Sequence, residues 1–195
     1  MKEPKLEKPG AGLPWLESWI AQVGFFIFRS LTSKEKALRF FEKEAELIIN
    51  VVTKLDAPKR MQRVLIDRIS GIEDSSRYWS VNMALQHLNS VNNAIIEGVE
   101  TLASGSNFGL EVKIANFKPK IEAAACELEL FRKANAEYAK KLNALPSLGS
   151  KVTHPHPWFG PLDAHGWHCL AAVHNQIHRL QIEKIIAGLD VQTEQ

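Results

Sequence analysis

Two histidines near the C-terminal end of the chain, His174 and His178, have the spacing of metal ligands on a helix. Residues four positions apart share one face of an α-helix, so both imidazoles can point at the same ion. Position 175 is Asn, so the glutamate that acts as general base in zincin-type proteases is missing and such a protease is disfavoured. A pair of this kind also occurs as a solvated or hydrogen-bonded pair without metal. The metal hypothesis therefore requires a third ligand from another helix.

His87 is the best candidate for this third ligand. It lies beside Ala84 and Val91, at the edge of the apolar stripe of its own predicted helix. An ionisable side chain is uncommon at such a position unless it has a partner or a function there. Three imidazoles with one open coordination position are typical of a catalytic metal site rather than a closed structural one. Imidazole ligands suit zinc, nickel, iron(II) or copper, and of these we expect zinc or nickel. The sequence thus predicts a divalent metal site made by His87, His174 and His178.

Other residues whose side chains could take part in chemistry are less clearly placed. The remaining histidines are expected in loops or on helix surfaces, with His168 a weaker alternative ligand: His154, His156, His165 and His168. No general base stands out, and three carboxylates are candidates by sequence position only: Glu73, Asp74 and Asp163. Three aromatic side chains could either wall a substrate pocket or anchor a loop onto the core: Trp158, Phe159 and Trp167.

The two cysteines, Cys126 and Cys169, form no paired framework, which favours a reducing, cytoplasmic setting. Neither is predicted to be reactive. Cys169 has no evident activating neighbour, and Cys126 lies beside an apolar stripe and is expected to be a core thiol.

Composition places the chain among ordinary globular proteins. Its 195 residues are 45% hydrophobic and 24% charged, which is enough to build a proper core. The formal net charge is only +2 and no basic run is present, so the sequence gives no support for a nucleic-acid partner.

Helical periodicity dominates the chain, and no strand-like alternation of useful length is found. Four long helices, each with one apolar stripe, are expected from Ser33 to Leu55, from Ser80 to about Ala103, from near Pro119 to Leu145, and from Asp163 to about Gly188. Ser33, Ser80 and Asp163 are suitable N-caps. A looser region suggests a short helix around residues 61–65 and a loop at 71–76. The economical way to bury four stripes is an all-α four-helix bundle, here with crossover connections or short inserted helices.

The N-terminal region precedes this bundle. We expect a flexible tail over residues 1–14, an appended amphipathic helix over 15–31, and the bundle over 32–190. The appended helix is aromatic and apolar, but it is too short and too polar for a confident membrane span. It is expected to pack on the bundle or on a second subunit. Attachment to a membrane surface is disfavoured, because its polar face lacks the usual Lys and Arg density.

Two segments resemble a known family. Tyr78-Trp79-Ser80 followed by Leu85-Gln86-His87-Leu88 resembles the "WS…HL" segment of DinB-like (YfiT-like) proteins. The run from His156 to Leu162, then Trp167 and the pair at 174 and 178, resembles their "HP-x-FG-x-L…W…H-x-x-x-H" segment. The likeness covers about Ser33 to Gly188, and the appended helix departs from the family pattern.

This resemblance implies a DinB-like four-helix bundle that binds a divalent metal near one end through His87, His174 and His178. It also implies a homodimer. The superfamily contains metal-dependent hydrolases and thiol-dependent transferases or isomerases that use bacillithiol, mycothiol or glutathione. The leading hypothesis is therefore a metal-dependent hydrolase or thiol transferase acting on a small-molecule substrate, with a low-molecular-weight thiol as a second cofactor in the latter case. The alternative is a non-catalytic, stress-related binding or scaffolding bundle.

Overall fold

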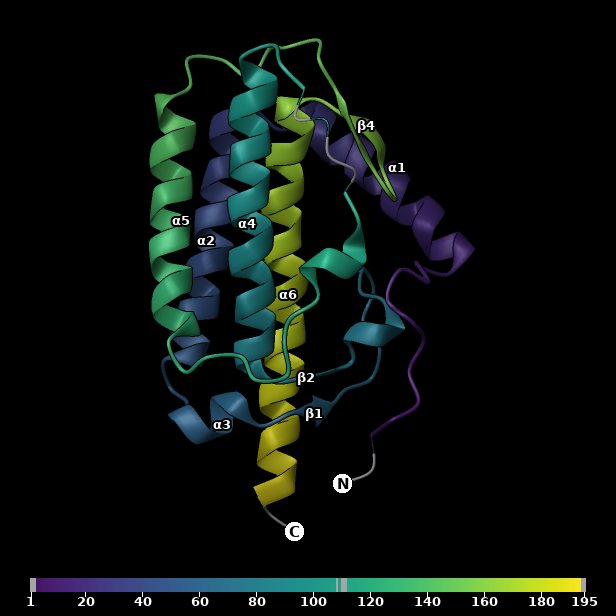
Figure 1. The fold of residues 1–195 in the computed structure, drawn as a ribbon, viewed down its shortest axis with the longest axis vertical. Coiled ribbons are helices and arrows are strands. Elements are labelled where there is room, and N and C mark those ends of the chain that lie inside the picture. The colour runs from purple at the N-terminus through teal and green to yellow at the C-terminus, as the bar shows by residue number, and fades with distance from the viewer. Residues whose placement is uncertain (1–2, 108, 110–111, 194–195) are drawn as a thin grey trace.

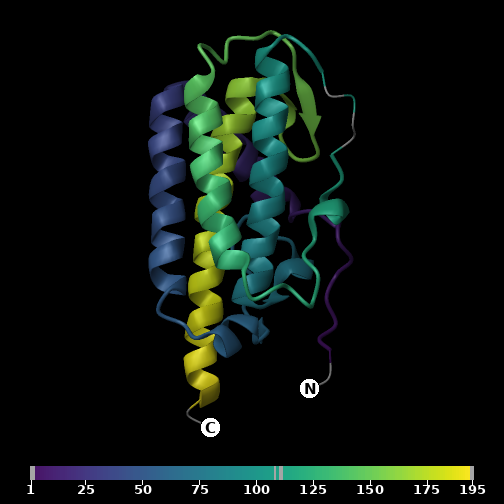
Figure 2. The ribbon, with the colours of Figure 1, turned by 60° about the vertical axis from the view of Figure 1, so that its left-hand side comes forward.

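Four long helices lie side by side and form a bundle in the computed structural model, which describes residues 3–107, 109 and 112–193 (Figures 1 and 2). They are α2 (Lys34–Val52), α4 (Val81–Ala103), α5 (Glu127–Ala144) and α6 (Ala164–Thr193). Helix α6 packs extensively against α2 and α4, and α5 packs mainly on α4. The predicted all-α four-helix bundle is confirmed.

The starts of two bundle helices follow from their caps. The hydroxyl of Ser33 accepts the backbone N–H of Lys36, and that of Ser80 accepts the N–H of Met83. Each bond satisfies one of the amide groups that the first turn of a helix leaves without an intrahelical partner. Ser80 therefore fixes where α4 begins, and with it the position of His87.

Helix α5 begins later than predicted. The sequence places its start near Pro119, but residues 119–126 form turns against α4 and the helix starts at Glu127. Side chains of α4 hold this segment, because the Asn82 amide donates to the Ala124 carbonyl at 3.0 Å and the Lys120 N–H donates to Gln86 Oε1 at 2.7 Å. These tertiary bonds compete with helix formation in the segment.

Helix α6 extends past its predicted end at Gly188. Its closest neighbour there is the short strand β1 (Val64–Leu65), because a Cβ added to Gly188 would lie 2.5 Å from Val64 Cγ1. The glycine therefore permits close packing of β1 against α6 rather than ending the helix.

Short elements connect the long helices. Helix α3 (Ala57–Met61) precedes β1, which pairs antiparallel with β2 (Tyr78–Trp79). The predicted short helix around residues 61–65 is therefore wrong for Val64 and Leu65. Two 3₁₀ turns, η1 (Asp74–Ser76) and η2 (Ile114–Phe117), and an antiparallel hairpin, β3 (His154–His156) with β4 (Gly160–Leu162), complete the fold.

Helix α1 (Trp15–Leu31) crosses the bundle obliquely, close to the β3–β4 hairpin (Figure 1). Phe25 is its one fully buried residue, and it packs on Phe159 of the hairpin with ring centroids 4.6 Å apart. The preceding chain is held by an acidic side chain, since Glu73 accepts the backbone N–H groups of Gly10 and Gly12. In the described part of the chain, no helix is long and apolar enough to cross a membrane. The division into tail, appended helix and bundle stays a prediction.

The bundle core contains a polar layer as well as apolar side chains. Asn175 of α6 is fully buried, accepts a 3.0 Å hydrogen bond from Asn92 of α4, and donates to the Phe41 carbonyl of α2. His168 is also fully buried and lies 3.0 Å from both the Tyr138 hydroxyl and the Lys34 carbonyl. The expectation of a surface or loop position for His168 is therefore wrong. Its two ring nitrogens tie α6 to α5 and to the start of α2.

Candidate metal centre

Three histidines converge where α4 packs on α6. His87 comes from α4, and His174 and His178 come from successive turns of α6. The Nε2 atom of His174 lies 3.1 Å from Nε2 of His87 and 3.1 Å from Nε2 of His178. The ligand atoms of all three lie within 4.8 Å of one another, so the trio could hold a metal ion.

The outward-facing nitrogens of His87 and His178 fix the protonation of both rings. His87 Nδ1 lies 2.6 Å from the Phe117 carbonyl, which can only accept a hydrogen bond, so Nδ1 carries the proton. His178 Nδ1 lies 2.6 Å from Gln181 Oε1, and the Gln181 amide nitrogen donates to the Ser76 carbonyl at 2.7 Å. This second bond fixes the orientation of the Gln181 amide. Both rings therefore present an unprotonated Nε2 to the centre.

His174 cannot satisfy both neighbours by hydrogen bonding. Its Nε2 faces two lone pairs at once, and a single N–H could serve only one of them. Its Nδ1 is buried and has no hydrogen-bond partner in the described part of the chain. A cation at the centre would satisfy all three Nε2 atoms. Tetrahedral zinc with Zn–N bonds of about 2.0–2.1 Å implies N···N separations of about 3.3 Å, close to the two observed.

Burial keeps these imidazoles neutral. Desolvation lowers the pKa of His87 from 6.5 to about 4. It also lowers the pKa values of His174 and His178 well below 6.5, and the neighbouring histidines of the trio add to the effect. Metal ions bind the unprotonated imidazole, so the rings are in the ligating form at neutral pH.

Trp79 and Lys118 flank the histidines. The Trp79 ring stacks on His178, with centroids 6.0 Å apart and an interplanar angle of 5°, and lies 5.3 Å from the His87 ring. The Lys118 ammonium lies 5.4 Å from the Trp79 centroid and donates to the hydroxyls of Ser75 and Ser76 at 2.8 Å. The indole of Trp79 therefore shields this side of the centre from water.

Of the three candidate carboxylates, Glu73 lines the cavity beside the histidines. It is 2% exposed and pairs with Lys118 at 3.1 Å. Burial opposes its ionisation, but the Gly10 N–H and the Lys118 ammonium outweigh burial and lower the pKa of Glu73. Asp74 instead pairs with Arg77, and Asp163 caps α6 by accepting the Gly166 N–H at 2.7 Å. Glu73 is thus a bound anion at neutral pH, already engaged by several donors.

A cavity of about 840 Å³ opens from the three histidines. Its walls come from α4 and α6. The covering elements include α1, η2, the β3–β4 hairpin and the segment 71–76. Trp158, Phe159 and Trp167 all line it, so they do wall a pocket. Most of the other lining side chains are aliphatic or aromatic. The histidines therefore lie at the margin of an apolar chamber large enough for a small organic molecule.

Two further histidines and one cysteine differ from expectation. His154 is buried and His156 lines the cavity, so neither is a simple surface residue. Cys126 is exposed rather than in the core, because α5 begins only after it. Cys169 is buried, and burial raises its thiol pKa to about 12, in agreement with the prediction that it is not a nucleophile.

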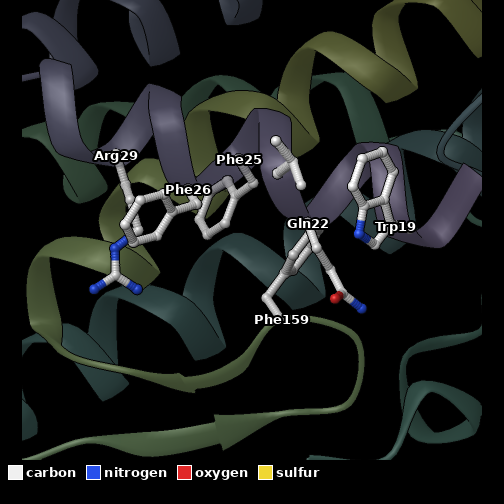
Figure 3. Close-up of a pocket in the computed structure, with 7 residues that line it drawn as sticks. Trp19, Gln22, Phe25, Phe26, Arg29 and Phe159 are labelled. Carbon is white, nitrogen blue, oxygen red and sulfur yellow. The ribbon is translucent and has the colours of Figure 1, made fainter.

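A second, shallower pocket of about 320 Å³ lies on α1 (Figure 3). Phe25, Phe26 and Phe159 surround it, with Trp19 at one end and Arg29 at the other. Among the described residues that line it there is no histidine, cysteine or carboxylate. Its lining offers apolar contact but no metal-binding or acid–base group.

Comparison with known proteins supports the fold. No family model matches the sequence, and no curated protein matches it. Among solved structures, the chain is similar to the crystal structure of TT2238, a four-helix bundle protein, with a TM-score of 0.54 and 18% sequence identity. The similarity covers 77% of this chain and 98% of that one. At this identity the likeness bears on the fold alone.

Proposed function

We propose that this protein is a metal-dependent enzyme of the DinB-like superfamily, with His87, His174 and His178 as ligands of a zinc or nickel ion. The observation that carries the proposal is the convergence of three Nε2 atoms, at least two of them unprotonated, beside an apolar cavity of about 840 Å³. The substrate is a small organic molecule. The reaction is either its hydrolysis or the transfer of a low-molecular-weight thiol to it.

The positions of the motif residues support the DinB-like assignment. Ser80 caps the helix that carries His87, and Trp79 packs against two of the three histidines. The run from His156 to Leu162 forms the hairpin that covers the cavity. The two segments on which the resemblance rests therefore contribute to the same site from distant parts of the chain.

The protein's own groups have distinct roles in this proposal. A divalent ion bound here would polarise a water or thiol and lower its pKa, supplying a nucleophile at neutral pH. Phe117 and Gln181 orient the rings of His87 and His178 through their Nδ1 protons. Trp79 excludes water from one side. Lys118 and Glu73 form a largely buried ion pair beside the centre, so this pair lines the site without adding net charge to it.

The proposal includes a homodimer located in the cytoplasm. Eight large apolar side chains of α1 are exposed, and exposed apolar patches often mark contacts between proteins: Trp15, Leu16, Trp19, Ile20, Val23, Phe26, Ile27 and Leu31. Both cysteines are free, as expected in a reducing compartment. Sedimentation equilibrium at micromolar concentration would give twice the chain mass, and a single-chain mass would contradict the dimer.

Metal analysis tests the central part of the proposal. Protein purified without chelator is expected to contain about one zinc or nickel ion per chain. His174→Ala should lose most of this metal while keeping the helical circular dichroism of the wild type. Metal near zero in wild-type protein, even after incubation with zinc or nickel and desalting, would contradict the proposal. Loss of thiol conjugation or ester hydrolysis in the same variant would then identify the reaction class.

A further inference from the structure

The cavity beside the histidines is elongated along the bundle. On α4 its lining residues recur three or four positions apart, from His87 through Val91, Ile95 and Gly98 to Thr101. At 1.5 Å per residue, the stretch from 87 to 101 spans about 21 Å. The histidines lie at one end of this stretch. An occupant that reaches the metal centre must therefore extend away from it, along α4.

The cavity is lined mostly by apolar side chains, but four further polar residues also line it: Glu97, Thr101, Asn116 and Gln176. Phe25 and Phe28 of α1 cover it, Phe159 of the hairpin closes one side, and Leu170 and Val173 of α6 form the floor with α4. Burial of alkyl or aryl groups against the apolar part of this lining removes them from water and is favourable. The far part of the occupant must therefore be largely apolar.

His156 is the histidine of the hairpin that lines the cavity. Its Nδ1 accepts two backbone N–H groups, from Trp158 at 3.1 Å and from Phe159 at 3.3 Å. Since backbone amides only donate, Nδ1 carries a lone pair and the proton of the neutral ring is on Nε2. Burial lowers the pKa of His156 to about 4, so the ring is neutral at pH 7.

The Nε2–H of His156 is therefore a fixed donor. Among the described residues it has no hydrogen-bond partner, although the ring lies against Phe159 and Trp167 with centroids 5.1 and 5.3 Å away. His156 and His174 line the same cavity. A donor without a protein partner in this cavity is placed to receive a hydrogen-bond acceptor of an occupant.

We propose that the cavity binds an elongated, largely apolar molecule end-on, with an oxygen-bearing head group at the histidine centre that accepts a hydrogen bond from His156 Nε2–H. This inference rests on the proposed metal site and adds the class of ligand. Long-chain or aryl-alkyl acyl compounds have this chemistry. His156 acts here as a positioning residue for the head group.

Alkyl hydroxamates of two and eight carbons, titrated into the cobalt(II)-loaded protein, test the proposal. The visible spectrum of cobalt reports head-group coordination, and the titration gives the affinity. Each added methylene buried in the cavity should improve affinity about fourfold, so the six further methylenes of the eight-carbon probe should tighten binding roughly four-thousandfold. Equal affinities for the two probes would overturn the proposal. Failure of cobalt to bind at all would instead contradict the proposed metal site.

Two variants separate the apolar channel from the head-group donor. Val91→Trp fills the cavity one turn above His87, so it should weaken the eight-carbon probe at least tenfold and leave the two-carbon probe within twofold. The matched control is Leu130→Trp on the exposed surface of α5, which should change neither affinity. If Val91→Trp binds cobalt, keeps its melting temperature and still binds the eight-carbon probe with unchanged affinity, the proposal that the alkyl chain lies in the cavity along α4 is wrong.

His156→Asn tests the donor without opening the hairpin. The Asn Oδ1 can replace Nδ1 as acceptor for the two backbone N–H groups, while the distant Nε2–H is lost. Both probes should then weaken by the same factor, about tenfold. A melting temperature close to that of the wild type would show that the hairpin is kept. Wild-type affinity for both probes in such a folded variant would overturn the role of His156.

Discussion

Replacing Gln181 by Met should weaken metal binding without touching a ligand. Gln181 is fully buried and joins His178 Nδ1 to the Ser76 carbonyl through hydrogen bonds of 2.6 and 2.7 Å. Methionine keeps the length and approximate volume of the side chain but leaves both partners unpaired. Each buried unpaired group costs about 1–3 kcal/mol, so the metal-free protein should lose about 2–6 kcal/mol of unfolding free energy.

The effect on metal should be separable from the effect on folding. Loss of the hydrogen bond that orients a histidine ligand typically reduces metal affinity about 10–100-fold. Competition with a chromophoric chelator at pH 7 measures this affinity, and urea unfolding of metal-free protein measures the stability.

Tyr138→Phe is a suitable control for this prediction. It removes a buried hydrogen bond to His168 in the same bundle but away from the centre, so it should cost stability and leave metal affinity unchanged. A folded Gln181→Met variant with wild-type affinity would refute the reasoning about ligand orientation.

Three further predictions concern the fold. Burial lowers the pKa of His168 from 6.5 to about 4, so the unfolded chain takes up this proton first as the pH falls. The loss of stability that His168 contributes should be about 3 kcal/mol between pH 6.5 and 4, in addition to the losses from the other buried histidines. Urea unfolding across this range should show a smaller drop in His168→Gln, and an equal drop would contradict the assignment. Gly188→Ala should lower the melting temperature and cost about 1–3 kcal/mol of unfolding free energy, because the new Cβ would lie 2.5 Å from Val64 Cγ1. Gly24→Ala should raise the melting temperature, because its Cβ would meet no atom within 4 Å and alanine favours the helix. The opposite order of melting temperatures would refute the packing argument. Ser80→Ala should cost about 1 kcal/mol in urea unfolding through the lost N-cap, and no change would show that the cap does not stabilise α4.

The sequence could predict the parts of this protein that depend on local periodicity. The spacing of His174 and His178 places them on one face of any helix, and the serine caps mark the helix starts at Ser33 and Ser80. His87 could be predicted only as a candidate, because its approach to the pair depends on how α4 packs against α6. The apolar stripe beside it was the available signal.

The parts that were missed depend on contacts between distant segments. Residues 119–126 contain a proline that a helix start tolerates, yet bonds to Gln86 and Asn82 hold them in turns. His168 is buried because two partners far along the chain, Tyr138 and Lys34, satisfy its nitrogens. Gln181 is different, since it lies three residues after His178 on the same helix. This spacing could have identified it as the group that orients the ligand.

The central claim is that three imidazoles from α4 and α6 bind one divalent ion. A crystal structure with anomalous scattering collected at the zinc and nickel absorption edges tests it most directly. We expect a single anomalous peak about 2.0–2.2 Å from Nε2 of His87, His174 and His178. An ion bound elsewhere, or a His87 ring turned away from a metal held by the other two, would contradict it.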